Sequence, residues 1–193
     1  MVISIGSKKI KTCVFISGNG SNLKNLIKFS KLKKSPITID LIISNKLNAK
    51  GLRFGKIFKI KKKIFYFKKK KLAEKQILLE LKKNKIDLIC LAGFMKILSK
   101  NFIKNFKGKI LNIHPSLLPK YKGLNTHERA IKNKEKYSGC TVHFVNSKLD
   151  SGKIIIQKKV KINKNETAKK LAKKILAQEH KLYPKAILNI FSL

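Results

Sequence analysis

The sequence has no tryptophan, only three cysteines and only nine acidic residues in 193 positions. The cysteines are odd in number, lie far apart and lack any C-x-x-C spacing, so we expect neither a disulfide framework nor a structural zinc site. The longest apolar run, residues 88–95, is far shorter than the roughly 20 residues that span a bilayer. The apolar stretch at the start is too short for a signal peptide. These absences predict a reduced, cytoplasmic protein with no membrane partner.

Acidic residues are scarce beside 47 basic ones, which gives the chain a formal net charge of +38. A balance this basic is typical of nucleic-acid-binding proteins. However, the basic residues are 45 lysines and two arginines, and arginine is the residue that most often reads base edges. The lysines are spread along the whole chain and accompany 27 isoleucines, and both residues have A/T-rich codons. Nucleotide bias is the simpler explanation, so we expect non-specific attraction of polyanions but no specific nucleic-acid partner.

Hydrophobic residues make up 43% of the chain, which is enough for a folded core, and the length suits one domain. The first half alternates apolar β-branched runs with helical patterns. This alternation favours parallel βαβ units, and therefore an α/β fold with a doubly wound, mostly parallel, Rossmann-like sheet flanked by helices. The predicted buried strands are residues 11–17, 37–44, 64–67 and 87–92, with helices opening at Ser21 and spanning 51–58 and 72–83.

The second half is less regular, and we expect it to belong to the same single domain, residues 1–193. Two lysine runs, residues 61–63 and 68–71, read as a solvated loop and a helix start. The predicted elements are strands at 109–113, 140–145 and 153–162, a loop at 115–122, a helix at 126–133, and a C-terminal helix at 166–193 interrupted by Pro184.

A glycine-rich turn, Ser17-Gly-Asn-Gly-Ser-Asn22, joins the first strand to the first helix. Glycines let the backbone approach a ligand closely, and the free N–H groups of a helix N-terminus attract phosphate. The turn is not a dinucleotide fingerprint, because Leu23 replaces the third glycine, and it is not a P-loop. It is either an anion site or a simple glycine turn in which Ser21 caps the helix.

Asn112 and His114 lie two residues apart on a predicted strand, so their side chains share one face. An amide donor beside an imidazole suits the stabilisation of an oxyanion and the transfer of a proton. A surface asparagine beside a hydrogen-bonded histidine would look the same. Asp150 lies in a turn between strands, where aspartate is common. We expect His143 to be a packed or supporting group.

Glu179 continues the apolar face of the C-terminal helix, where a carboxylate needs a cation or several donors. A structural ion pair with a lysine is the simpler alternative. His127 and His180 have no partners at the spacing of metal ligands, so we expect no metal site.

These motifs occur together in the order found in one family. The chain resembles the phosphoribosylglycinamide formyltransferases, folate-dependent enzymes of purine biosynthesis, from about residue 11 to near the C-terminus. The motif Asn-x-His-x-Ser-Leu-Leu-Pro with a later Leu-Asp-x-Gly is shared by 10-formyltetrahydrofolate transferases and hydrolases, whereas Gly-Asn-Gly-Ser-Asn points to the glycinamide ribonucleotide branch. The matching segments are residues 16–23 (ISGNGSNL), 91–98 (LAGFMKIL), 111–121 (LNIHPSLLPKY), 123–127 (GLNTH), 142–145 (VHFV), 149–152 (LDSG) and 178–180 (QEH).

The resemblance implies that the formyl group of 10-formyltetrahydrofolate, the co-substrate, passes to the glycine amine of 5-phosphoribosylglycinamide. Asn112 and His114 would polarise the formyl oxygen. Asp150 would favour the protonated ring of His114 and help deliver a proton to the departing folate nitrogen. His143 would support these side chains from a second layer.

The resemblance also assigns the substrate contacts. An N-terminal half of about residues 11–107 would bind phosphate, and a C-terminal half of about 108–193 would carry the folate and catalytic groups; whether the enzyme is a homodimer stays open. The phosphate would contact Gly20, Ser21 and Asn22, the glycine ammonium would contact Glu179, and the folate would contact Lys70, Met95, Lys96, Ile97, Leu98 and Asn112.

Two positions depart from the usual family pattern. Lys96 stands where arginine is common, which removes bidentate geometry from the folate pocket. Asn125 stands where histidine is frequent. We expect either change to weaken folate binding without abolishing it.

Two relatives of the same chemistry fit the sequence less well. A methionyl-tRNA formyltransferase would need a further C-terminal domain of about 100 residues, and a formyltetrahydrofolate hydrolase normally has an N-terminal regulatory domain. A basic, non-catalytic nucleic-acid-binding protein is the alternative from another class, and its binding would survive the substitution His114→Ala.

Overall fold

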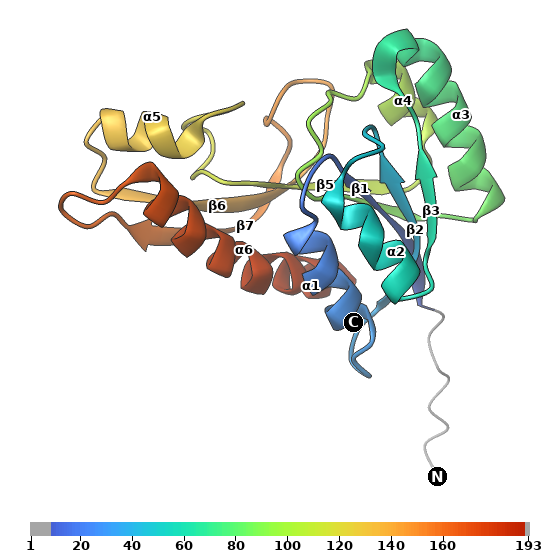
Figure 1. Cartoon of the computed structure of the whole chain (residues 1–193), viewed down its shortest axis with the longest axis horizontal. Helices are drawn as coiled ribbons and strands as arrows, with labels where there is room; N and C mark the ends of the chain where they lie inside the picture. The colour runs from blue at the N-terminus through green and yellow to red at the C-terminus, as the bar shows by residue number, and fades with distance from the viewer. Residues whose placement is uncertain (1–8, 192–193) are drawn as a thin grey trace.

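The computed structural model describes residues 9–191, in which seven strands form one sheet in the order β3-β2-β1-β4-β5-β6-β7 (Figure 1). The strands are β1 (Ile10–Ile16), β2 (Ile37–Ser44), β3 (Lys61–Ile64), β4 (Leu88–Leu91), β5 (Lys109–His114), β6 (Tyr137–Phe144) and β7 (Ile154–Lys161). The helices are α1 (Ser21–Ser30), α2 (Arg53–Ile57), α3 (Lys70–Lys83), α4 (Lys100–Asn105), α5 (Thr126–Lys132) and α6 (Ala168–Phe191), with 3₁₀ turns at Lys50–Leu52 and Phe67–Lys69.

Strands β1 to β5 pair in parallel, and only β6 and β7 run antiparallel to their neighbours. The predicted α/β class with a mostly parallel sheet is therefore confirmed. The strand order reverses beside β1, because β2 and β3 lie on one side of it and β4 and β5 on the other. In open α/β sheets, ligands bind at the carboxyl ends of the strands near such a switch point.

Helices cover both faces of the sheet, because the side chains of each strand alternate between two apolar clusters. Val14 and Ile16 of β1 face one cluster, which α1, α2 and α6 complete, whereas Cys13 and Phe15 face the other, which α3 and α4 complete. Figure 1 shows α1 and α6 side by side on one face, and α3 and α4 together on the opposite face. All three cysteines are buried and free.

The third strand is the clearest error of the sequence prediction. Residues 61–63, interpreted as a solvated lysine loop, form most of β3, and the predicted strand at 64–67 contributes only Ile64. The side chains of residues 61–63 are exposed rather than buried, because β3 is the edge of the sheet. Charged edge strands discourage pairing with other chains, so lysine is physically suited to this place.

Other elements differ at their ends. Helix α4 was not predicted, β6 begins at Tyr137 rather than at residue 140, and α6 begins at Ala168 rather than at residue 166. Pro184 does not interrupt α6, which continues through it to Phe191. The remaining residues of the predicted helix, 192–193, lie outside the described residues. No helix within residues 9–191 is long and apolar enough to cross a membrane.

Candidate active site

The predicted site residues gather at the carboxyl edge of the sheet. The glycine-rich turn follows β1, and the 92–99 loop follows β4. His114 is the last residue of β5, and Asn112 precedes it on the same strand, paired with Leu91 of β4. This edge contains the switch point beside β1, where the fold places a ligand.

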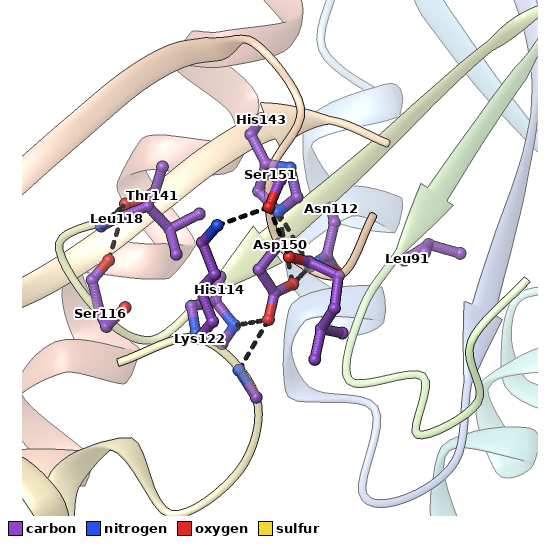
Figure 2. Close-up of polar contacts among 12 residues, drawn as sticks. Leu91, Asn112, His114, Ser116, Leu118, Lys122, Thr141, His143, Asp150 and Ser151 are labelled. Carbon is purple, nitrogen blue, oxygen red and sulfur yellow. Dashed lines mark hydrogen bonds and ion pairs between the residues drawn. The ribbon is translucent and has the colours of Figure 1, made fainter. Parts of the chain in front are cut away.

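Asn112 and His114 each direct a side-chain nitrogen at Asp150 (Figure 2). Nδ2 of Asn112 lies 3.4 Å from Oδ1 of Asp150, and Nδ1 of His114 lies 3.4 Å from Oδ2. The His114 residue is 5% exposed and the side chain of Asp150 is 9% exposed. The structure therefore brings the three residues predicted to be catalytic together in a partly dehydrated place, where electrostatic interactions are stronger than in water.

His143 holds the amide of Asn112 from the neighbouring strand, β6. Nδ1 of His143 lies 2.8 Å from the carbonyl oxygen of Phe144, which only accepts hydrogen bonds, so Nδ1 carries a hydrogen. Burial lowers the pKa of His143, which keeps its ring neutral. Its Nε2 therefore accepts a hydrogen bond from Nδ2 of Asn112 at 3.2 Å. Both amide hydrogens of Asn112 are thus directed, one at His143 and one at Asp150.

Two backbone groups complete the surroundings of His114 and Asp150. Nε2 of His114 lies 2.8 Å from the carbonyl oxygen of Tyr121, and the N–H of Gly123 donates to Oδ2 of Asp150 at 2.9 Å. The sequence motifs contain Tyr121 and Gly123, but sequence reasoning gave neither a role. Backbone contacts leave no signature in residue type, so only the course of the chain reveals them.

Asp150 lies in the predicted turn between β6 and β7, with a left-handed φ of 44° that aspartate tolerates better than most residues. Gly152 lies against Phe144, so closely that a Cβ atom there would be 1.7 Å from the Phe144 carbonyl oxygen. That carbonyl also accepts the hydrogen bond from His143. The turn that presents Asp150 therefore packs directly on the group that fixes the tautomer of His143.

The glycine-rich turn forms the second part of the site. Helix α1 begins at Ser21, and its N-cap is Gly20 with a left-handed φ of 71°, so the alternative in which Ser21 is the cap is wrong. A Cβ on Gly20 would lie 2.7 Å from Cα of Gly51, because the two backbones touch. The first N–H groups of α1 have no partners within the helix and are available to an anion.

Glu179, on α6, lies beside Asn22 of the glycine-rich turn. Its Oε2 accepts a hydrogen bond from Nδ2 of Asn22 at 2.7 Å, and burial raises the pKa of this carboxyl group despite that bond. Within residues 9–191, no basic side chain forms an ion pair with Glu179, so a structural ion pair does not explain it. Oδ1 of Asn22 is buried and has no hydrogen-bond partner in the described chain.

The residues predicted to contact folate occupy two segments at the same edge. Met95, Lys96 and Ile97 are exposed in the loop after β4, whereas Leu98 is buried in the core. Lys70 begins α3, with its Nζ 4.0 Å from Oε1 of Glu74.

Two contacts hold these folate segments in place. The ring centroids of Phe67 and Phe94 lie 5.6 Å apart, which joins the start of α3 to the loop after β4. The N–H of Met95 donates to Oγ of Ser17 at 2.8 Å, which joins the same loop to the end of β1. The loop after β4 therefore borders the glycine-rich turn, and the start of α3 packs against that loop.

The histidines outside this cluster have no role that the geometry reveals. Nδ1 of His127 and Nε2 of His180 are buried without hydrogen-bond partners within residues 9–191. Burial lowers the pKa of both rings. Across the same residues, no group of three or more histidine, cysteine or acidic side chains is arranged to hold a metal ion.

Comparisons with known proteins agree with the fold. The sequence profile of the family described as "Formyl transferase" matches residues 10–187. Phosphoribosylglycinamide formyltransferase of Haemophilus influenzae is 42% identical over 180 residues, which cover 92% of this chain and 85% of that protein. A crystal structure of phosphoribosylglycinamide formyltransferase from Brucella melitensis matches with a TM-score of 0.89 at 42% identity, covering 95% of this chain and 96% of that one.

The chain also matches part of a longer relative. The human trifunctional purine biosynthetic protein adenosine-3 is 41% identical over 187 residues, which cover 95% of this chain. The chain spans only 18% of the length of that protein.

Proposed function

The chain belongs to the formyl transferase family, and we propose that it transfers the formyl group of 10-formyltetrahydrofolate to the glycine amine of 5-phosphoribosylglycinamide. The relatives that it spans almost in full are named for this substrate and this transfer. In this proposal, the half before about residue 108 binds the phosphate, and the half from about residue 108 to residue 193 supplies the catalytic groups.

The observation that carries the proposal is the convergence of two side-chain nitrogens, one from Asn112 and one from His114, on the carboxylate of Asp150. Asn112 and His114 reach the Asp150 carboxylate over 3.4 Å each, which is long for a hydrogen bond. Each donor is held more tightly from behind, Asn112 by His143 at 3.2 Å and His114 by Tyr121 at 2.8 Å. The formyl oxygen would replace the long contacts to Asp150 and leave the short ones intact. Donors arranged in advance around a developing oxyanion are a large source of catalysis.

The reaction balances with these groups. The substrate amine attacks the formyl carbon, a new C–N bond forms, and the carbonyl π electrons move onto oxygen. Asn112 donates to this oxyanion, and so does His114 when its Nδ1 also carries a hydrogen. The bond from carbon to N10 of the folate then breaks. The attacking nitrogen loses one proton and the departing N10 gains one. Asp150, the one carboxylate that pairs with His114 among residues 9–191, is placed to accept and return that proton, directly or through water.

The surroundings of Glu179 fit a cationic ligand. Its carboxylate is buried with a single hydrogen-bond donor, and the neighbouring Oδ1 of Asn22 lacks any partner among residues 9–191. A substrate ammonium has three donors and a positive charge, so it would satisfy both acceptors and offset the cost of burial. The phosphate of the same substrate would lie at Gly20, Ser21 and Asn22, where α1 begins.

The folate would lie along the loop after β4. Met95 and Ile97 expose apolar side chains there, which suit a flat aromatic ring, and Lys96 and Lys70 supply positive charge for its carboxylates. Leu98 supports this surface from the core, and Asn112 is shared with the formyl group.

The experiment that tests the proposal follows the release of tetrahydrofolate by the purified protein. We expect release only when both 5-phosphoribosylglycinamide and 10-formyltetrahydrofolate are present. Release without the nucleotide would identify a hydrolase instead. The variant His114→Ala should abolish transfer while the nucleotide still binds, and the variant Lys132→Ala, which changes a lysine of α5, should behave as the parent. If no tetrahydrofolate is released when both substrates are present, the proposal is overturned.

A further inference from the structure

The backbone of residues 121–123 lies against both His114 and Asp150. The Tyr121 carbonyl oxygen lies 2.8 Å from Nε2 of His114. Two residues later, the N–H of Gly123 donates a hydrogen bond to Oδ2 of Asp150. One short segment therefore contacts both members of the pair through main-chain atoms.

The Tyr121 carbonyl constrains the protonation of His114. A carbonyl oxygen only accepts, so Nε2 of His114 carries a hydrogen. The other ring nitrogen, Nδ1, faces the Asp150 carboxylate at 3.4 Å. In a neutral ring only one nitrogen carries a hydrogen, so the two acceptors compete, and the shorter contact to Tyr121 holds the hydrogen on Nε2. Nδ1 is then the nitrogen of the neutral ring that carries no hydrogen, and it faces Asp150.

The backbone of Tyr121 is unusual for a bulky residue. Its φ is 55°, in the left-handed region that residues other than glycine, asparagine and aspartate rarely adopt. Such a conformation persists only where surrounding contacts hold it, and these conformations are frequent at functional sites. The carbonyl direction therefore depends on what fixes the side chain.

Three polar groups fix the side chain of Tyr121. Its hydroxyl donates to Oε1 of Glu135 at 2.9 Å and accepts from Nδ2 of Asn133 at 2.9 Å. The guanidinium of Arg129 lies 5.1 Å from the ring centroid. Lys120 Nζ donates to the same Oε1 of Glu135 at 2.8 Å.

The charge on Glu135 keeps this anchor in place at neutral pH. Hydrogen bonds from Lys120 and from Tyr121 lower the pKa of the Glu135 carboxyl group, so it remains an acceptor. Glu135 lines a surface pocket together with Lys134, Lys136 and Lys159, which add positive charge around it.

From these contacts we propose that Tyr121 is a positioning residue, whose carbonyl, anchored through Glu135, holds the hydrogen on Nε2 of His114 and so reserves Nδ1 for exchange with Asp150. Neither group touches the reacting atoms. The consequence for turnover rests on the proposed formyl transfer, whereas the consequence for the His114 tautomer does not. Without the anchor, the Tyr121 backbone relaxes, the carbonyl moves away, and Asp150 draws the hydrogen of the neutral ring to Nδ1.

The test compares the parent with Tyr121→Phe and Glu135→Gln, each of which removes one side of the anchor. Nitrogen NMR of the histidine-labelled protein, without substrates, reports the tautomer of the neutral His114 ring. We expect the Nε2–H form in the parent and a gain of the Nδ1–H form in both variants. A pure Nε2–H ring in both variants, or a parent ring that is already Nδ1–H, would overturn the proposal.

Kinetics supply the second readout. We expect kcat to fall by about tenfold or more in both variants, since a well-placed acid–base group contributes roughly 10²–10⁴-fold, with little change in KM for the nucleotide. A parent that transfers no formyl group would overturn the proposed function and leave the tautomer result standing. An unchanged kcat together with a changed tautomer would overturn the catalytic part of this inference.

Matched controls exclude a general effect of losing such groups. Glu80 accepts from Lys61 at 2.7 Å and from Asn84 at 2.8 Å on the far edge of the sheet, so Glu80→Gln removes a similar carboxylate. Tyr66→Phe removes the hydroxyl of an exposed tyrosine. Both should retain the parental tautomer and kcat. If one test variant does not fold, the tautomer of the other decides.

Discussion

The amide of Asn112 has no spare hydrogen in the free protein, because His143 and Asp150 each receive one. A substrate oxygen that accepts a hydrogen bond from this amide would therefore displace one of these acceptors. The contact to Asp150 is the longer of the two, and Asp150 keeps the donor N–H of Gly123 when it is released. In the proposed reaction, the formyl oxygen would take the place of Asp150, while the neutral ring of His143 still holds the amide of Asn112.

Removal of this donor gives the first prediction. The variant Asn112→Ala should lower kcat by about 10²–10³-fold, as the loss of one oxyanion donor does elsewhere, and should leave nucleotide affinity nearly unchanged. Steady-state kinetics and calorimetric titration with the nucleotide measure the two effects. The matched control is Asn105→Ala, since Asn105 bonds only within its own helix. If nucleotide affinity falls by as large a factor as kcat, Asn112 binds the nucleotide rather than the oxyanion, and the prediction is wrong.

Glu179 gives a prediction on stability. Burial raises its pKa in the folded protein, so the unfolded chain ionises first as pH rises. The free energy of unfolding therefore loses a contribution as pH climbs from the ordinary carboxyl value through the raised folded value. Glutamine has no such proton. The variant Glu179→Gln should be more stable than the parent at pH 8, and the difference should vanish below about pH 4.

The control for this prediction has the opposite sign. The hydrogen bond from Lys61 is the largest cause of the lowered pKa of Glu80. The ionised Glu80 carboxylate therefore stabilises the folded protein at neutral pH, and this contribution is lost as pH falls through the pKa of Glu80 in the folded protein. The variant Glu80→Gln should accordingly be less stable than the parent at pH 8. Urea unfolding across this range measures both, and a Glu179→Gln protein that is less stable at every pH would contradict the argument.

At the scale of elements, the connection from β1 to α1 depends on the close approach of two glycine backbones. Gly20 needs its left-handed φ, and Gly51 leaves no room for a Cβ beside it. The N–H of Gly51 also donates to the carbonyl oxygen of Gly18 at 2.9 Å, which joins the turn to the segment before α2. The start of α1, where the proposal places the phosphate, is therefore shaped by two loops together.

The substitution Gly20→Ala should destabilise the protein by about 1–3 kcal/mol, since a Cβ there meets backbone 2.7 Å away at a strained φ. The neighbouring Gly18→Ala is the control, because a Cβ there meets nothing within 4 Å. Urea unfolding at fixed pH compares the two. If the two variants are equally stable, the loops that contain Gly20 and Gly51 can move apart with little loss in the free energy of unfolding, and the prediction is wrong.

The sequence predicted the central elements well because their signal is local. Strands such as β1 and β2 are continuous apolar runs, and the helices between them show the 3.6-residue period. Edge strand β3 has no such signal, since three of its four residues are exposed lysines that pair only because β2 lies beside them. Helix α4 is short and is capped by Ser99, whose hydroxyl and N–H both donate to the distant Glu74.

The same limit applies to the site. That Asn112, His114 and Asp150 lie together, and that Glu179 lies beside the glycine-rich turn, was expected from the family motifs, and their chemical roles stay predictions. The contacts of Tyr121 with His114 were not, because a main-chain carbonyl looks the same in every residue and the fold alone decides where it points. Pro184 misled for a related reason, since the packing of α6 outweighs the local preference of proline.

At the scale of the whole molecule, a net charge of +38 on 193 residues is the dominant property. Lysines lie on every part of the chain, and few have an acidic partner among residues 9–191. Such a surface attracts nucleic acid without reading it. We expect single-stranded RNA to bind weakly, with an affinity that falls steeply as salt rises, and equally well to the parent and to His114→Ala. Filter binding over a salt series measures this, and binding that depends on His114 or on RNA sequence would favour the nucleic-acid-binding alternative.

The same charge opposes folding, because like charges are closer together in the compact state than in the unfolded chain. Added salt screens this repulsion, and the Debye length falls from about 30 Å at 0.01 M to about 8 Å at 0.15 M. Sodium chloride over this range should therefore raise the free energy of unfolding by about 1 kcal/mol, and with it Tm by about 2–4 °C for a chain of this size. Calorimetry measures the shift. Chloride is the right anion, since sulfate strengthens apolar burial in any protein. Sucrose at matched osmolality is the control for general solvent effects. A Tm that falls or stays constant as chloride is added would show that the lysines do not repel one another enough to affect folding.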